Sequence, residues 1–132
     1  MEINDAFLDA LTEKAKASPR LRMNYDLRNA DGDCSQRMLN AVQPGSRPPI
    51  HRHLDTSASC IIVRGRIDSI FYDDKGNEIK RFHLDANKGL YGVQIPQGQW
   101  HSLESLEEGS VLFEAKNGVW HPIEGAELLY EV

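Results

Sequence analysis

The sequence has few cysteines, little basic charge and no long apolar runs, and each shortage argues against a class of protein. Two cysteines among 132 residues are too few for the disulfide framework of a small secreted domain. The formal net charge of −5 argues against a nucleic-acid partner, because binding phosphate backbones requires a basic field. No apolar stretch approaches the roughly 20 residues of a membrane helix, so we expect no membrane partner.

The N-terminus is acidic and lacks a basic start followed by an apolar run, so we expect no signal peptide and a cytoplasmic location. Hydrophobic residues at 40% and charged residues at 27% are typical of a globular protein. A chain of this length is most simply one domain, and it can bury a core without disulfide or metal cross-links.

The first predicted element is a helix within residues 1–19. Asn4 is a suitable N-cap, and the helix should end before Pro19, because the residue preceding a proline is pushed out of the helical region. Apolar side chains recur at helical spacing at Phe7, Leu8, Leu11 and Ala15. This stripe predicts a helix that packs on the outside of a sheet.

From residue 20 onward the pattern changes to short strands separated by turns. Turn signals recur about every eight to twelve residues, which is typical of all-β sandwiches and barrels, including double-sheet jelly rolls. Gly65 interrupts one apolar run, and a glycine there indicates a bend such as a barrel corner. We expect strands over residues 20–28, 36–42, 60–63, 67–72, 80–84, 90–95, 101–106 and 111–116.

Three histidines are candidate metal ligands. His51 and His53 point the same way if their segment is extended, because side chains on a strand repeat every second position. His101 follows a turn at Pro96–Gly98, and strands that end at one mouth of a barrel would bring it to the other two. Three protein ligands with open positions describe a catalytic site, and imidazole suits several divalent transition metals, here Zn, Fe, Mn or Ni. The alternative is an exposed loop pair and an unrelated third histidine.

Two motifs resemble those of the cupin superfamily. The pattern Gly45-x5-His51-x-His53, closing at Gly65, resembles the first cupin motif, and Pro96-x-Gly98-x2-His101 resembles the second. More narrowly, the segments at residues 36–40, 64–66 and 113–116 resemble the WbuC family of cupin-fold metalloproteins. This resemblance covers nearly the whole chain, including the N-terminal helix.

The resemblance implies a single cupin domain over residues 1–132, in which the helix (1–19) precedes an all-β barrel (20–132). The barrel would be a small double-stranded β-helix, or jelly roll, with one divalent transition metal at its mouth. It also implies a small sugar or sugar-nucleotide-type substrate in surface-polysaccharide metabolism, with isomerase- or epimerase-like chemistry. An iron-dependent oxygenase and a non-catalytic metal- or sugar-binding module are the alternatives. A homodimer is expected by analogy with other small cupins.

The sequence departs from the first cupin motif at one ligand. The motif supplies a glutamate at the position of Ala58, and alanine cannot coordinate a metal. Water or substrate is our preferred occupant of the vacant position. Asp55 continues the alternation from His53 and would serve if the strand extends that far. Cys60 shares the parity of Ala58 and is a third possibility, although cysteine is more often a small buried hydrophobe.

Three polar side chains are candidates for holding an anionic substrate near the mouth: Arg37, Asn40 and Arg47. Guanidinium groups pair well with carboxylate and phosphate, although a solvated surface arginine explains each position equally well. Arg37 and Asn40 differ in strand parity, so we do not expect both to face the cavity.

Overall fold

A computed structural model describes residues 1–130 of the chain. One α-helix, two short 3-10 helices and ten strands lie within this range. In chain order they are α1 (Asp5–Ala17), β1 (Arg22–Asp26), β2 (Ser35–Val42), β3 (Ile50–His51), β4 (Ala58–Arg64), β5 (Arg66–Tyr72), β6 (Glu78–Asp85), η1 (Ala86–Lys88), β7 (Gly92–Ile95), β8 (Trp100–Ser105), β9 (Val111–Asn117), η2 (Gly125–Glu127) and β10 (Leu128–Tyr130).

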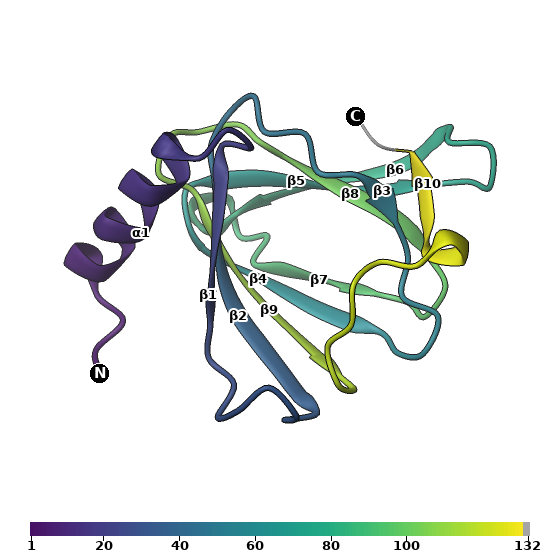
Figure 1. The fold of residues 1–132 in the computed structure, drawn as a ribbon. Coiled ribbons are helices and arrows are strands. Elements are labelled where there is room, and N and C mark those ends of the chain that lie inside the picture. Colours follow the sequence, from purple (N-terminus) through teal and green to yellow (C-terminus); the bar gives the residue numbers. More distant parts are fainter. Residues whose placement is uncertain (131–132) are drawn as a thin grey trace.

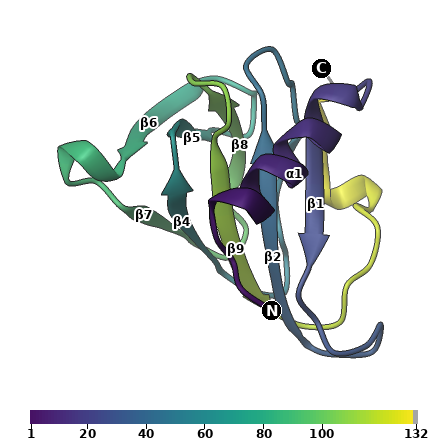
Figure 2. The same cartoon turned by 90° about the vertical axis from the view of Figure 1, so that its left-hand side faces the viewer.

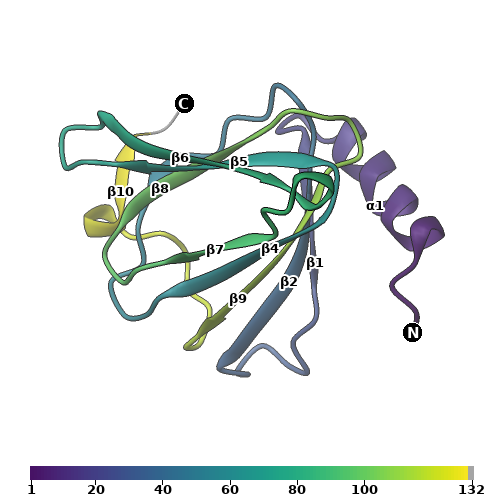
Figure 3. The same cartoon turned by 180° about the vertical axis from the view of Figure 1, so that it is seen from behind.

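The strands form two antiparallel sheets that face each other as the walls of a barrel (Figure 1, and from behind in Figure 3). One sheet has the order β1-β2-β9-β4-β7, and the other has the order β10-β3-β8-β5-β6. Each sheet therefore combines strands that are distant in the sequence, which is how residues from separate motifs reach one mouth. The expectation of an all-β barrel with an N-terminal helix is confirmed.

Helix α1 lies outside the barrel, against the sheet that contains β1 and β2 (Figure 2). Asn4 caps it, since its Oδ1 accepts a hydrogen bond from Phe7 N at 3.0 Å. Its buried residues Leu8, Leu11 and Ala15 pack against side chains on the outer face of the sheet, among them Leu39. The predicted apolar stripe is thus the face of the helix that is buried.

Gly65 is the corner at which the chain passes from one sheet to the other. It separates β4 from β5, which belong to opposite sheets, and its φ of 82° is in the left-handed region that glycine adopts at low cost. A Cβ at this position would lie 2.8 Å from Ser110 Cα. Both the backbone conformation and the close approach of Ser110 therefore require glycine.

The interior of the barrel changes from apolar to polar toward the histidines. The closed end is filled by the buried residues Val42, Ile62, Ile67, Leu84 and Leu112. A second group, Ala58, Cys60, Phe71 and Ile95, lies nearer the histidines, and Phe71 stands opposite His101 in the β5–β8 register. The apolar side chains close one end of the barrel, and the polar side chains at the other end are the candidates for binding a ligand.

The C-terminal region differs from the sequence-based expectation. After β9 ends at Asn117, the exposed residues Val119 and Trp120 lie outside any strand. The final strand β10 was not predicted, and it pairs with β3, which carries His51. No helix within residues 1–130 has the length and hydropathy needed to cross a membrane.

Candidate metal centre

The three histidines lie together at one mouth of the barrel. His51 on β3 stands directly opposite His101 on β8. His53 follows in a loop, and its backbone carbonyl accepts a hydrogen bond from Gly98 N at 2.8 Å. The ring centroids of His51 and His101 are 4.3 Å apart, and those of His53 lie 5.1 and 5.3 Å from them. One nitrogen from each ring lies within 4.8 Å of the other two, so the three side chains could hold one metal ion.

Backbone carbonyls orient two of the three rings. His51 Nδ1 lies 3.0 Å from Pro49 O, and His101 Nδ1 lies 2.8 Å from Gln99 O. A carbonyl oxygen only accepts hydrogen bonds, so each Nδ1 must be the donor. The lone pair of each neutral ring is then on Nε2, which is the arrangement found for histidine ligands held by a second hydrogen bond.

The histidines are held in the neutral form that binds metals. Burial lowers the pKa of His51 and of His101, and it is the largest cause in both cases. Burial, followed by the positive charge of Lys116, lowers the pKa of His53 to about 3. Because metal binding requires deprotonated imidazole, these shifts remove competition from protons near neutral pH.

Lys116 occupies the side of the site from which the motif glutamate is missing. Ala58 faces the interior with 6% of its surface exposed, and Lys116 on β9 is its direct partner in the β4–β9 register. Lys116 Nζ lies 3.4 Å from His53 Nε2, to which it donates. A cationic side chain therefore stands beside the histidines on the wall where the motif would place an anionic one.

A buried polar group lies further along the same strand. Cys60 and Glu114 are partners in the β4–β9 register, and Cys60 Sγ lies 3.8 Å from Glu114 Oε1. Asn40 Nδ2 donates to Glu114 Oε2 at 3.4 Å, while the buried Asn40 Oδ1 has no protein partner among the described residues. Burial is the main cause that raises the pKa of Glu114 and that of the Cys60 thiol. The thiol contacts Glu114 and stays protonated, which disfavours Cys60 as a thiolate ligand.

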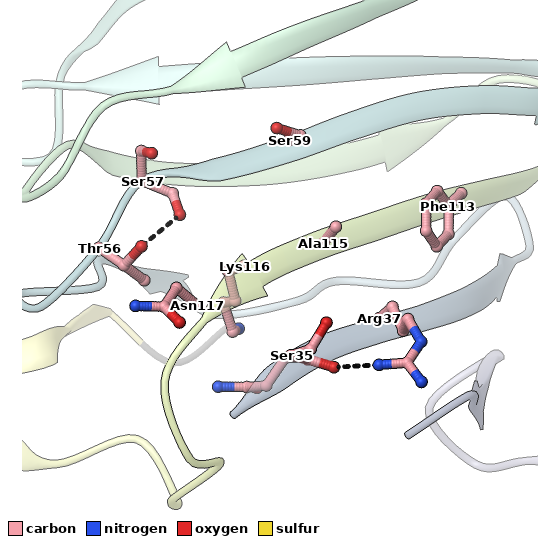
Figure 4. A pocket seen from close by; sticks show the side chains of 10 residues that line it. Ser35, Arg37, Thr56, Ser57, Ser59, Phe113, Ala115, Lys116 and Asn117 are labelled. Carbon is pink, nitrogen blue, oxygen red and sulfur yellow. Dashed lines mark hydrogen bonds between the residues drawn. The ribbon is translucent and has the colours of Figure 1, made fainter. Parts of the chain in front are cut away.

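The other candidate residues lie apart from the histidines. Strand β3 ends at His51, and the Asp55 side chain, 81% exposed, has its Oδ2 3.9 Å from His121 Nε2. Arg37 projects from the outer face of its sheet, where its Nη1 lies 3.3 Å from Asp33 Oδ2. It lines an open pocket of about 400 Å³ with Ser59, Ala115 and Phe113 (Figure 4). Asn40 faces the interior and Arg37 does not, as their difference in strand parity predicted.

The C-terminal segment fastens the strand that carries His51. Arg52 N donates to Glu127 O at 2.9 Å, and Arg52 Nε donates to Ala126 O at 3.0 Å. The Arg52 guanidinium also lies 4.2 Å above the ring of Trp100. Arg52 therefore points away from the metal centre and joins β3, β8 and η2 into one support for His51 and His101.

The sequence analysis did not identify Lys116 as a neighbour of the histidines, and it did not predict what Glu114 would contact. The available signal was parity, because Leu112, Glu114 and Lys116 alternate along one strand and two of them are charged on a face that begins with a core leucine. That pattern marks a polar interior, but it does not say which side chain each residue will meet.

Comparisons with known proteins agree with this architecture. The model of the family described as "Domain of unknown function (DUF6016)" matches residues 3–84. No curated protein matches the sequence. Among solved structures, the capsular polysaccharide assembling protein CapF from Staphylococcus aureus is similar, with 23% identity, a TM-score of 0.67, and coverage of 83% of this chain and 30% of CapF.

Two further structures have the same fold. An oxalate oxidase in complex with glycolate is 16% identical, with a TM-score of 0.65 and coverage of 82% of this chain and 56% of that one. A cupin-2 domain from Rhodospirillum rubrum is 18% identical, with a TM-score of 0.57 and coverage of 80% and 66%. The chain thus spans about a third of CapF and just over half of the oxalate oxidase. At these identities the similarity shows the fold, which is a small cupin barrel.

Proposed function

Because this chain belongs to the DUF6016 family and folds as a small cupin barrel, we propose that it is a metal-dependent cupin acting on a small sugar or sugar-nucleotide-type substrate. The reaction we propose is isomerase- or epimerase-like, within surface-polysaccharide metabolism. CapF is a capsular polysaccharide assembling protein, which supports this setting by analogy of fold alone.

One observation carries the proposal, namely the convergence of three neutral imidazoles whose ligand atoms lie within 4.8 Å of one another. Two of them are oriented by backbone carbonyls and so present Nε2 to a common point. This donor set fits a divalent transition metal with positions left open for water or substrate. Such an ion, when bound, polarises a carbonyl or hydroxyl oxygen of the substrate as a Lewis acid.

The protein's own side chains then have separate roles. His51, His53 and His101 hold the ion. Lys116 Nζ is a hydrogen-bond donor beside them, and we assign it the orientation of a substrate oxygen after its contact with His53 opens. The apolar residues around Phe71 and Ile95 close the barrel beneath the site and limit the access of water from that side.

The test is the metal content of protein purified without chelators, measured by elemental analysis. We expect one equivalent of Zn, Fe, Mn or Ni in the wild-type protein, and its loss in His51→Ala and in His101→Ala. His83→Ala is the matched control, because this histidine is 70% exposed on β6 and contacts Asp68. Wild-type protein that neither retains nor takes up any of these metals would contradict the proposal.

A non-catalytic metal-binding module is the second candidate, and a specific observation favours it. Ala58 removes the carboxylate ligand and Lys116 adds a positive charge opposite it, so the site departs from the enzyme motif in two ways. Turnover assays on sugar nucleotides with the zinc- and manganese-loaded protein separate the two candidates. Oxygen consumption by the ferrous protein alone would instead indicate the iron-dependent oxygenase.

Three finer assignments are also proposals. We propose membership of the WbuC family, for which the motifs at residues 36–40, 64–66 and 113–116 are the support. We also propose a homodimer and a cytoplasmic location. Light scattering coupled to size-exclusion chromatography tests the homodimer, and cell fractionation tests the cytoplasmic location.

A further inference from the structure

Three arginines line one open pocket beside the loop that leads to His51. The pocket has a volume of about 530 Å³, which is within the range of small-molecule sites. It is lined by Pro19, Arg20, Leu21, Arg22, Gly45, Arg47 and Pro49. No acidic side chain is among these residues, although the chain as a whole carries a net charge of −5.

Three of the four arginines that have no acidic partner within residues 1–130 line this pocket. The chain has nine arginines, and five of them form ion pairs with carboxylates within residues 1–130: Arg28, Arg37, Arg64, Arg66 and Arg81. A sixth, Arg52, stacks on Trp100. The remaining three are the arginines of the pocket, and in the described part of the chain none of them has an ion pair. A protein with more acidic than basic residues thus places three of its four arginines that have no carboxylate partner within residues 1–130 around one pocket.

The backbone of the pocket is held in an unusual conformation. Leu21 has a φ of 56°, a left-handed conformation that costs a leucine about 1–2 kcal/mol. Hydrogen bonds hold it in place, from Leu21 N to Ser18 O at 3.0 Å and from Gln43 N to Leu21 O at 2.9 Å. The neighbouring carbonyl of Arg20 accepts from Ser46 Oγ at 2.6 Å. Strained conformations that the surrounding structure maintains are concentrated at binding and catalytic sites.

The pocket adjoins the metal centre through Pro49. Pro49 lines the pocket, and its carbonyl oxygen accepts the hydrogen bond that orients His51. Arg22 is tied to the same loop, since its Nη1 donates to Ser46 Oγ at 3.3 Å. A ligand group bound among the arginines would therefore contact a loop residue, Pro49, that lies only two positions before His51 in the chain.

We propose that this pocket binds the phosphate group of a phosphorylated small molecule. Guanidinium groups pair with phosphate oxygens through two parallel hydrogen bonds, and three such groups without protein counter-charges match the multiple oxygens of one phosphate or diphosphate. The inference deepens the proposed function and rests on it only in treating the remainder of this molecule as the substrate of the histidine site.

The test is isothermal titration calorimetry at fixed ionic strength, first with inorganic phosphate as the probe. We expect saturable binding with one phosphate per chain, and binding at least about tenfold weaker in Arg20→Gln and in Arg47→Gln. Both side chains are exposed and make no hydrogen bond within residues 1–130, so the variants should fold normally. Arg66→Gln is the matched control, because it removes the same charge next to Glu107, outside the pocket. Phosphate affinity that falls equally in the control, or no saturable binding to the wild-type protein, would overturn the inference.

Three further measurements separate the possible outcomes. Binding of glucose 1-phosphate or UDP-glucose more tightly than phosphate supports a substrate phosphate, whereas weaker binding of both overturns that assignment. Acetate bound as tightly as phosphate would overturn the selectivity for phosphate. His51→Ala should lose metal and keep phosphate affinity, and the arginine variants should do the reverse, so failure of this inference and failure of the proposed function are distinguishable.

Discussion

Replacing Lys116 with methionine should tighten metal binding. Lys116 Nζ donates to His53 Nε2 at 3.4 Å, and we expect this nitrogen to be the one that His53 would offer to an ion held with His51 and His101. The ion therefore has to displace a charged hydrogen bond before His53 can coordinate. Methionine has similar length and packs well in irregular interiors, so the substitution removes the competing donor without leaving a large cavity.

The size of the effect follows from the strength of that hydrogen bond. Hydrogen bonds to charged groups contribute about 1.5–3 kcal/mol, and the long distance of 3.4 Å places this one near the lower limit. Since about 1.4 kcal/mol corresponds to a tenfold change in affinity, the Kd for zinc should fall about tenfold. Competition titration against a chromophoric zinc chelator at constant pH measures this change directly.

Two controls accompany the measurement. Lys88→Met makes the same chemical change at an exposed position on η1 and should leave the Kd unchanged. Lys116→Arg keeps the charge and the donor and should show no gain. Weaker zinc binding by Lys116→Met would refute the reasoning, because the amine would then be helping to hold the ion rather than competing with it.

Three other predictions concern the fold and the buried polar group. Gly65→Ala should lower the free energy of urea unfolding by more than about 2 kcal/mol, since it adds left-handed strain and a steric clash, whereas Gly32→Ala, where an added Cβ meets no atom within 4 Å, should have little effect. In the native protein one thiol should react with a disulfide-exchange reagent, and two should react after denaturation. The reason is that Cys34 is exposed, whereas Cys60 is buried and its thiol has a raised pKa. Two fast-reacting thiols in the native protein would contradict this. Burial raises the pKa of Glu114 above the unfolded value of 4.5, so the protonated carboxyl stabilises the fold below that pH and this stabilisation is lost as pH rises. Between pH 5 and pH 8, measured in chelator, the unfolding free energy of Glu114→Gln should therefore rise relative to that of the wild type. Parallel pH profiles for the two proteins would count against this.

Local rules were sufficient for much of the fold. The helix begins at Asp5 after the Asn4 cap and ends at Ala17 before Pro19, because capping and proline sterics act within a few residues. Gly65 marked the barrel corner for the same reason, since a left-handed φ is a property of one residue. The three histidines were identified because their spacing and their neighbouring turns resemble the two cupin motifs.

Long-range register decided the rest. Strand β10 has no strong signal of its own and exists through its pairing with β3, far earlier in the chain. Lys116 reaches His53 across 63 residues of sequence because β9 and β4 pair with Ala58 opposite Lys116, and a shift of one residue would turn the amine to the outer face.

The sequence by itself indicated the fold class, through its recurring strands and turns, and the three candidate histidines, through their spacing. The resemblance to the first cupin motif then indicated that a carboxylate is absent at Ala58. Only the tertiary structure decided what lies beside these residues, which is the amine of Lys116 within the barrel and three arginines gathered around the left-handed Leu21 outside it. The physical reason is that side-chain contacts between distant segments depend on strand register and loop conformation, which composition and local periodicity do not specify.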